Sequence, residues 1–225
     1  MTESDNLPPL VSVLISSYNH ADFIEASIRS VYAQSYPNIE LLVVDDGSRD
    51  GSVEVIRRLQ AELGFDFVAQ ANKGLCTTLN EMIGRSKGRY VAPLGSDDVM
   101  LPERFSLQVP FMEQHPETGI CAGGIVLIDG DGKPLPDKKQ RHRPARRLDF
   151  DDLFMDRKPG PPAPTLLFRR EALEEALWGD NVPDSDSLRS HIHQLRQALD
   201  KPFDRPLLHT VHGVGFRLAE DGDAH

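Results

Sequence analysis

Strand-length apolar runs alternate with amphipathic helical segments through the first hundred residues, and this alternation most restricts the folds available to the chain. The run LVSVLIS at 10–16 is almost continuously apolar, as expected for a strand buried on both faces of a parallel sheet. The next segment, 18–35, repeats apolar residues at helical spacing, and 36–46 returns to a strand pattern. Alternating strands and helices predict an α/β fold with a mostly parallel, doubly wound sheet and flanking helices.

The same patterns predict the remaining elements of the first 170 residues. Gly64 is the expected stop of the second helix, and Ser52 is a candidate N-cap. The expected elements are a turn and a helix over 47–64, a strand over 65–70, a helix over 75–88, a strand over 89–98, a helix that begins near 105 and ends near His115, two strands joined by a DGDGK turn over 121–136, and a strand over 165–170.

Polar side chains follow the expected strands, and ligands of such sheets bind outside the carboxyl ends of the strands. A tyrosine there can stack on a base, an aspartate can accept hydrogen bonds from a base or ribose, and paired carboxylates can hold a divalent metal beside a diphosphate. Asp45 and Asp46 could instead start a turn and cap the following helix. The polar groups are Tyr18 with Asn19, Asp45 with Asp46, Asn72 with Lys73, and Asp97 with Asp98.

Charge and cysteine content restrict the class of protein. The formal net charge of −10 argues against general nucleic-acid binding, but it does not exclude a local basic patch. One basic segment, 138–147, could face an anionic acceptor or partner or could be a solvated loop. Cys76 and Cys121 are too far apart to predict a metal cluster, so free thiols in a reducing compartment are expected.

The apolar runs are far shorter than the roughly 20 residues that a membrane span requires. The acidic N-terminal residues 1–10 lack the basic and apolar regions of a signal peptide. We therefore expect a cytoplasmic protein without a membrane span.

Residues 11–52 and 72–108 resemble the ordered motifs of family 2 glycosyltransferases, which have the Rossmann-like GT-A fold, and the resemblance extends to about Arg170. It implies a nucleotide-sugar donor, often a UDP- or dTDP-sugar, together with Mg²⁺ or Mn²⁺. It assigns Tyr18 to the base pocket, Asp46 to a hydrogen bond with the base, and Asp97 and Asp98 to the diphosphate and metal. Asp98 would be the direct metal ligand. Asn19 and Asn72 complete the predicted nucleotide-binding set.

The sequence departs from this family in two places. Many members carry an aspartate where Gly95 stands, so metal ligation here would rest on fewer carboxylates. After a segment like LLFRREAL the family usually continues with a Gly-Gly turn and a Glu-Asp pair that supplies the catalytic base for the acceptor hydroxyl. Asp184 and Asp186 stand in roughly that place, and Asp186 is the candidate base. Because the usual continuation is missing, we expect weak or absent turnover, by an inverting mechanism, toward a glycan, lipid-linked or other hydroxyl acceptor.

Residues 170–218 instead resemble the C-terminal part of winged-helix effector domains in OmpR/PhoB-type response regulators. Segment 170–180 matches the helix before the recognition helix, 184–199 the recognition helix, and the strand–turn–strand pattern of 207–218 the wing. The resemblance and the charge pattern make Arg189, His193, Arg196 and His212 candidate DNA contacts. The alternative is an ordinary amphipathic helix with a solvated basic face.

We therefore predict two domains, a GT-A nucleotide-sugar-binding domain over 1–170 and a winged-helix-like segment of two helices and a β-hairpin over 171–225. The primary hypothesis is a metal-assisted glycosyltransferase. The alternative is a DNA-binding regulator that contacts DNA only through the C-terminal segment. A third possibility is a chimera joined near 168–179, because the sequence FRREALEEALWG suits either family.

Overall fold

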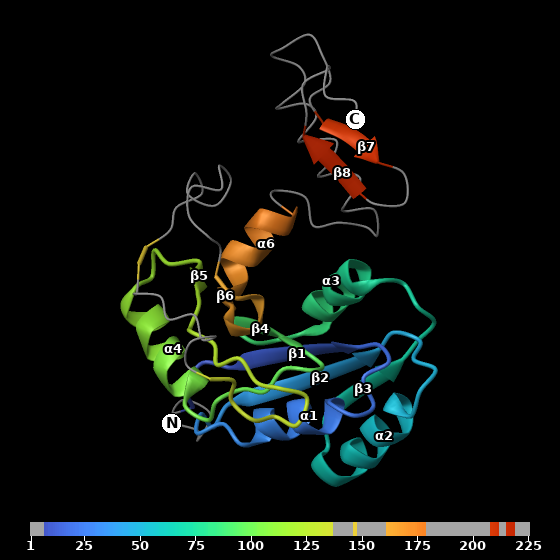
Figure 1. Ribbon diagram of the computed structural model, residues 1–225. Coiled ribbons are helices and arrows are strands. Elements are labelled where there is room, and N and C mark those ends of the chain that lie inside the picture. Colours follow the sequence, from blue (N-terminus) through green and yellow to red (C-terminus); the bar gives the residue numbers. More distant parts are fainter. Residues whose placement is uncertain (1–6, 137–145, 148–160, 179–207, 212–214, 219–225) are drawn as a thin grey trace. The chain divides into compact units, whose positions relative to one another are not determined.

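The computed structural model describes residues 7–136, 146–147, 161–178, 208–211 and 215–218 (Figure 1). The chain comprises two compact units, Met1–Ala172 and Leu173–His225. Within the described part of the chain, no helix has the length and apolar character needed to cross a membrane.

A six-stranded sheet with the order β3-β2-β1-β4-β6-β5 forms the centre of the first unit. Its first four strands are parallel, and β6 pairs antiparallel with both β4 and β5, which confirms the mostly parallel α/β prediction. From β1 the chain adds β2 and β3 on one side and β4 on the other, so the strand order reverses between β1 and β4. The strands are β1 (Val11–Ser17), β2 (Ile39–Asp45), β3 (Asp66–Ala69), β4 (Tyr90–Gly95), β5 (Ile120–Cys121) and β6 (Leu167–Arg169).

Helices cover both faces of this sheet. Figure 1 shows α1 and α2 on one face and α3 on the other, as right-handed crossovers in this strand order require. The helices are α1 (Ile24–Tyr32), α2 (Ser52–Leu63), α3 (Leu75–Arg85), α4 (Arg104–Gln114) and α6 (Arg170–Trp178), with a 3₁₀ turn, η3, at Ala163–Thr165.

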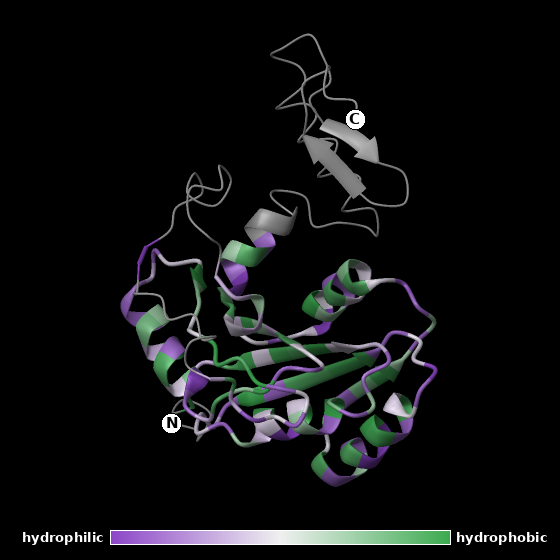
Figure 2. Ribbon diagram, in the orientation of Figure 1, coloured by the Kyte–Doolittle hydropathy of each residue, from purple (hydrophilic) through white to green (hydrophobic). Residues whose placement is uncertain are grey.

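The main hydrophobic core lies between the sheet and the helices α1, α2 and α4. Alternate residues of β1, namely Val11, Val13 and Ile15, enter this core and are fully buried. Leu14 points to the opposite face and is buried as well, which explains the continuous apolar run from Val13 to Ile15 in the middle of β1 (Figure 2). The core residues contributed by the helices are Ile24, Ile28, Val31, Ile56, Leu59, Phe105, Val109 and Met112.

The sequence prediction is wrong at the N-terminal end of α2 and is confirmed at its C-terminal end. Ser52 is wrong as the N-cap, because Gly51 occupies that position and Ser52 is the first helical residue. Its hydroxyl donates a hydrogen bond to Asp50 Oδ1 (2.5 Å) rather than capping the helix. Gly64 ends the helix as predicted, with a left-handed φ of 79° and its N–H bonded to Gln60 O at 2.9 Å.

Gly64→Ala is expected to destabilise the first unit by about 1 kcal/mol, because a side chain disfavours the left-handed conformation. No other atom lies within 4 Å of the position of the added Cβ, so the cost comes from the backbone and not from a clash. Gly64→Asn is the matched control, since asparagine tolerates this conformation better. Urea unfolding of both variants gives the comparison, and an Ala variant as stable as wild type would contradict the assignment.

The region 121–136 forms the predicted turn but not the two predicted strands. Asp129 Oδ1 accepts hydrogen bonds from the backbone N–H groups of Asp131 (3.0 Å) and Lys133 (2.9 Å). The expected strands are reduced to β5 and to a single bridge between Ile128 and Pro134. The two glycines that follow β5, Gly123 and Gly124, have low strand preference, which accounts for the early end of pairing. Cys121 in β5 and Cys76 in α3 are free thiols, as predicted.

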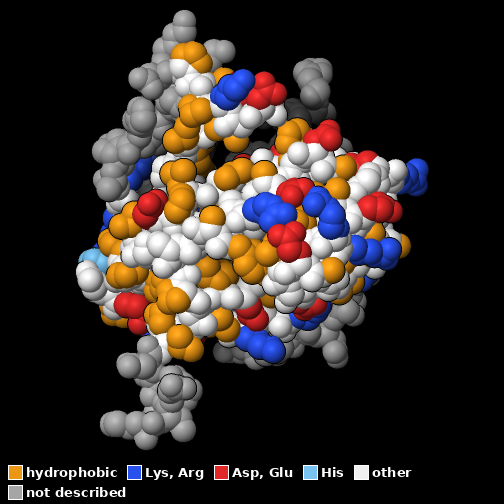
Figure 3. Space-filling view, turned by 90° about the horizontal axis from the view of Figure 1, so that it is seen from below, with side chains coloured by type: hydrophobic (Ala, Val, Ile, Leu, Met, Phe, Trp, Pro, Cys, Tyr) orange, Lys and Arg blue, Asp and Glu red, His pale blue; other side chains and the backbone are white. Residues whose placement is uncertain are grey.

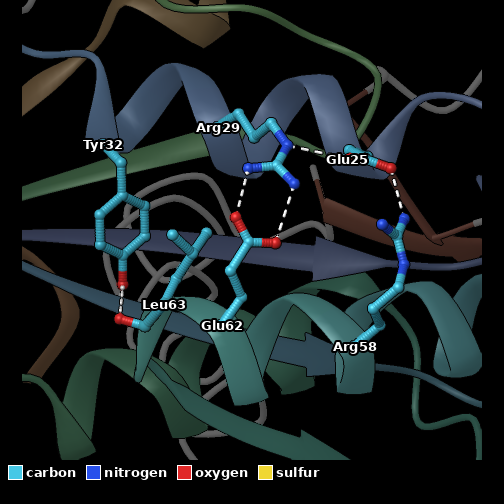
Figure 4. A network of polar contacts seen from close by, with 6 residues as sticks. All are labelled: Glu25, Arg29, Tyr32, Arg58, Glu62 and Leu63. Atoms are coloured by element: carbon cyan, nitrogen blue, oxygen red, sulfur yellow. Dashed lines mark hydrogen bonds and ion pairs between the residues drawn. The ribbon is translucent and has the colours of Figure 1, made fainter.

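Ion pairs connect α1 to α2 on the outer surface. Arg29 bonds Glu62 in a bidentate arrangement (2.9 and 3.0 Å) and also Glu25 (2.9 Å), and Arg58 bonds Glu25 (Figure 4). The hydrogen bonds from Arg29 lower the pKa of both glutamates, and Arg58 adds to this effect at Glu25. Acidic and basic side chains are interspersed on this face (Figure 3). Because the groups are exposed, the network contributes little to stability.

Two consecutive arginines, at the end of β6 and the start of α6, hydrogen-bond to other elements of the first unit. Arg169 is buried, and its guanidinium donates to Met112 O (2.7 Å), Tyr90 Oη (3.2 Å) and Thr118 O (3.3 Å). Arg170 donates to Gly88 O (2.6 Å) and Ser86 Oγ (2.7 Å). The Arg-Arg pair of the FRREAL sequence is therefore an integral part of the sheet domain.

In the second unit, β7 (Leu208–Val211) and β8 (Gly215–Leu218) form an antiparallel pair, which confirms the predicted hairpin. Leu208 pairs with Leu218, and Val211 pairs with Gly215. The predicted recognition helix, 184–199, lies outside the described residues.

Candidate functional site

A cavity of about 430 Å³ opens at the carboxyl ends of β1, β2 and β4, where the strand order reverses. This is the position at which open α/β sheets bind ligands. Four of the six predicted nucleotide- and metal-binding residues, Tyr18, Asp46, Asn72 and Asp97, line it. The complete lining is Ser16, Tyr18, His20, Asp46, Asn72, Gly74, Leu75, Gly95, Ser96 and Asp97.

Asp45 and Asp46 are both buried, but they have different roles. Asp45 accepts hydrogen bonds from the backbone N–H (2.9 Å) and the hydroxyl (2.6 Å) of Ser48. It therefore stabilises the turn after β2, which is the alternative considered for it from the sequence. Asp46 faces the cavity instead.

Asp46 holds the loop that leads into α3. Its Oδ1 accepts from Gln70 Nε2 and Lys73 N, and its Oδ2 accepts from Gly74 N, each at 2.9 Å. Burial favours the protonated carboxyl, but these hydrogen bonds outweigh burial and lower the pKa of Asp46. The residue therefore places Asn72, Gly74 and Leu75 along the cavity wall as an ionised carboxylate.

The loop after β1 contributes two residues to the cavity. Tyr18 is about half exposed (47%), so its ring is accessible to a ligand. Asn19 does not line the cavity. It has a left-handed φ of 54°, and its Oδ1 accepts from Arg49 N at 2.8 Å, which ties the loop to the one after β2.

His20 is a lining residue that the sequence prediction missed. Its Nδ1 lies 2.6 Å from Ser96 Oγ, and Ser96 belongs to the turn after β4. The available signal was its place directly after Tyr18 and Asn19 at a strand end. An isolated histidine at that position does not reveal which partner it meets.

The carboxylates of Asp97 and Asp98 converge above Gly95. A Cβ on Gly95 would lie 2.9 Å from Asp97 Oδ1 and would overlap Asp98 Oδ2. The turn is closed by a hydrogen bond from Asp98 N to Gly95 O (3.1 Å). Burial and then the neighbouring Asp97 charge raise the pKa of Asp98. In the described residues no group of three or more His, Cys, Asp or Glu side chains could hold a metal ion, so the protein itself offers these two carboxylates.

The other predicted site residues lie outside the described part of the chain. They are the candidate base Asp186 and the candidate DNA contacts Arg189, His193, Arg196 and His212.

Comparison with known proteins identifies two families. The family described as "Glycosyl transferase family 2" matches residues 12–177, and that described as "Transcriptional regulatory protein, C terminal" matches residues 163–218. The two matches share residues 163–177.

Curated relatives of the first region are glycosyltransferases. TuaG of Bacillus subtilis (strain 168), assigned provisionally to teichuronic acid biosynthesis, is 36% identical over 149 residues, which are 65% of this chain and 58% of TuaG. The uncharacterized glycosyltransferase alr2836 of Nostoc sp. (strain PCC 7120 / SAG 25.82 / UTEX 2576) is 32% identical over 177 residues, 76% of this chain and 54% of the relative. The chain thus spans about half the length of the curated relatives it matches.

Solved structures with the same fold include two complexes with nucleotide sugars. The mannosyltransferase PcManGT from Pyrobaculum calidifontis, in complex with GDP-Man and Mn²⁺, has a TM-score of 0.53 at 22% identity and covers 80% of this chain and 49% of its own. S. aureus TarS 1–349 in complex with UDP-GlcNAc has a TM-score of 0.55 at 20% identity and covers 74% and 47%. These similarities confirm the GT-A fold. Together with the family match over most of its length, they show that the chain belongs to glycosyltransferase family 2.

Proposed function

We propose that the cavity binds a nucleoside diphosphate-sugar and that the chain transfers the sugar to a hydroxyl of a glycan, a lipid-linked or another acceptor. The observation that carries this proposal is the convergence of Tyr18, Asp46 and Asp97 from three different strand ends on one cavity at the switch point. The lining combines an accessible aromatic ring, that of Tyr18, with the carboxylate of Asp97, and the Asp98 carboxylate lies beside Asp97 above Gly95.

The base would occupy the part of the cavity lined by Tyr18, Asn72 and Leu75. Tyr18 can stack on the base, and Asn72 is exposed and can present its amide to it. Asp46 already accepts three hydrogen bonds through its two oxygens, so only a remaining acceptor position on Oδ2 is available for the base. Its main contribution is to hold the wall formed by the 70–74 loop.

The diphosphate would lie beside Asp97 and Asp98 with Mg²⁺ or Mn²⁺. Two carboxylates fit such an ion, since these hard cations are commonly held by one or two carboxylates together with the phosphates of a substrate. When bound, the ion supplies positive charge that neutralises the diphosphate leaving group. Asp98 is the proposed direct ligand, and Asp97, which is more exposed, faces the diphosphate.

UDP is the donor nucleotide to test first, and dTDP is the second. TarS has been solved with UDP-GlcNAc and with UDP. The relative WfaP of Escherichia coli, 36% identical over 104 residues (46% of this chain and 41% of WfaP), is named as a UDP-Glc-dependent glucosyltransferase. PcManGT was solved with GDP-Man, so GDP is the appropriate competitor for measuring base preference.

Asp186 is the proposed catalytic base of an inverting transfer. It would remove the proton from the acceptor hydroxyl as that oxygen attacks the anomeric carbon. Because the sequence around it departs from the family pattern, we expect turnover to be slow even where the donor binds well.

The proposal is tested by calorimetric titration of the full chain with UDP in Mn²⁺ and in EDTA. Binding that is strong in Mn²⁺ and weak in EDTA is expected, and the order of affinity should be UDP or dTDP above GDP. Mass spectrometric detection of free UDP released from UDP-Glc or UDP-GlcNAc follows transfer and hydrolysis. If none of the three nucleotides binds in Mn²⁺, the proposal is wrong.

Gly95→Ala is expected to weaken the binding of UDP in Mn²⁺ by about tenfold while the thermal midpoint changes little. The added methyl group would displace Asp98 Oδ2 and crowd Asp97 Oδ1, but both are ends of side chains that can move without unfolding the turn. Gly84→Ala, in α3 with open space around its Cβ position, is the matched control. Unchanged UDP affinity in Gly95→Ala would show that these carboxylates do not contact the diphosphate.

A second candidate function is DNA binding by the C-terminal segment. The regulator family match over 163–218 and the hairpin of β7 and β8 favour it. Arg189, His193, Arg196 and His212 would contact phosphates and base edges. A gel shift at low salt with Arg196→Ala as control tests it, since phosphate contacts make affinity fall steeply as salt increases. Absence of salt-sensitive binding would remove this candidate.

We also propose that the chain divides into domains 1–170 and 171–225 and that it arose by recombination near 168–179. The overlap of the two family matches supports this proposal.

A further inference from the structure

His20 joins the loop after β1 to the turn that carries the two carboxylates. Its Nδ1 is 2.6 Å from Ser96 Oγ, and Ser96 is buried and immediately precedes Asp97. Both His20 and Ser96 line the cavity. This contact therefore crosses the switch point between β1 and β4.

The position of His20 is itself fixed by the loop after β2. Its backbone N–H donates to Ser52 Oγ (3.0 Å), and the Ser52 hydroxyl donates to Asp50 Oδ1 (2.5 Å). The other oxygen of Asp50 accepts from Ala21 N (3.0 Å). The imidazole and the Phe23 ring pack in a T-shaped arrangement, with a distance of 6.1 Å between ring centroids and an interplanar angle of 86°. The loops after β1, β2 and β4 thus meet at one histidine.

The turn after β4 is also held by a hydrogen bond that does not involve His20. Ser27 Oγ donates to Gly95 O at 3.1 Å, which holds the first residue of the turn against α1. His20 holds the second residue, Ser96. Removal of the imidazole nitrogen would leave the turn attached at its start and closed by the Asp98 N to Gly95 O bond, but Ser96, directly before Asp97, would lose its side-chain contact.

We propose that His20 is a positioning residue that fixes the turn 95–98 so that Asp97 and Asp98 face the donor diphosphate. This inference rests on the proposed nucleotide-sugar function. It concerns the diphosphate part of the cavity only, because the contact between His20 and Ser96 involves neither Asn72 nor Leu75.

The test compares His20→Phe with His20→Asn. Phenylalanine keeps a ring beside Phe23 but removes Nδ1, whereas the asparagine amide places a polar atom near the position of Nδ1. UDP affinity in Mn²⁺ is measured by calorimetry, and uridine affinity without metal is measured by ligand-observed NMR. His20→Phe should weaken UDP binding by about two- to tenfold, the factor expected for one hydrogen bond. Uridine binding should be unchanged, and His20→Asn should recover most of the UDP affinity.

A double-mutant cycle with Ser96→Ala separates positioning from a general loss of structure. If the two residues act through one contact, the double variant should lose no more UDP affinity than His20→Phe alone. His115→Phe is the matched control, since this histidine stacks on Phe111 at the end of α4, away from the cavity lining. It should leave UDP affinity unchanged.

Two results would overturn the inference while the proposed function stands: additive losses in the cycle, or an equal fall in UDP and uridine affinity in His20→Phe. Failure of the wild-type protein to bind any of UDP, dTDP and GDP in Mn²⁺ would instead overturn the proposed function, and the inference would fail with it. The wild-type titration therefore distinguishes the two failures.

Discussion

Asp98→Asn is expected to weaken the binding of UDP in Mn²⁺ by about 100-fold and to abolish the difference between titrations in Mn²⁺ and in EDTA. Loss of an outer-shell partner alone costs a metal site about 10–100-fold, and loss of a direct ligand should reach at least the upper value. Only two carboxylates converge above Gly95, so in the described structure no third acid of a cluster can compensate.

Asp131→Asn is the matched control for this substitution. Its carboxylate lies in the exposed DGDGK turn, with 79% of the side chain accessible, and it has the same change of charge. The control should retain wild-type affinity, which excludes a long-range effect of net charge. Equal affinity of wild type, Asp98→Asn and Asp131→Asn would contradict the metal assignment, provided that thermal unfolding shows Asp98→Asn to be folded.

Asp46→Asn is expected to destabilise the first unit by about 3 kcal/mol at neutral pH. Three N–H donors, from Gln70, Lys73 and Gly74, point at its two oxygens. An amide must turn its NH₂ group toward at least one of these donors, so that donor loses its partly buried hydrogen bond and is left unpaired. Urea unfolding at pH 7 measures the difference in the free energy of unfolding.

The pH dependence of this difference follows from the direction of the Asp46 pKa shift. The pKa is lower in the folded protein than in the unfolded chain, so the carboxylate stabilises the fold at pH values above the unfolded pKa of about 3.9. This stabilisation is lost as the pH falls through the folded pKa. The difference between wild type and Asp46→Asn should therefore be complete at pH 7 and should shrink below about pH 4.

Asp129→Asn is the control for Asp46→Asn. Both hydrogen bonds to Asp129 end on a single oxygen, Oδ1, which asparagine retains. Its turn is exposed, so a small loss of stability is expected. A similar decrease in the free energy of unfolding in both variants would show that the three donors around Asp46 do not stabilise the fold more than the two donors around Asp129 do.

Local sequence patterns were sufficient to predict the elements of the parallel half of the sheet. Strand and helix periodicities are properties of neighbouring residues, and β1, β2 and β4 consist of the expected apolar segments. The prediction was less accurate at 121–136, because the only strand that reaches this region is β5 (Ile120–Cys121), which pairs with β6, a strand more than forty residues away in the sequence. No local pattern specifies such a partner.

The succession of strands and helices and the set of polar residues that follow the strands can be predicted from the amino-acid sequence alone. This is possible because parallel strands joined by helices place their carboxyl ends on one edge of the sheet. The separate roles of these residues depend on contacts in the folded chain: Asp45 holds a turn, Asp46 faces the cavity, Asn19 joins two loops, and His20 contacts Ser96. The deciding hydrogen bonds of Asp46, Asn19 and His20 connect residues that are 24 to 76 positions apart. Their partners are fixed by strand order and loop path, which no short segment of sequence encodes.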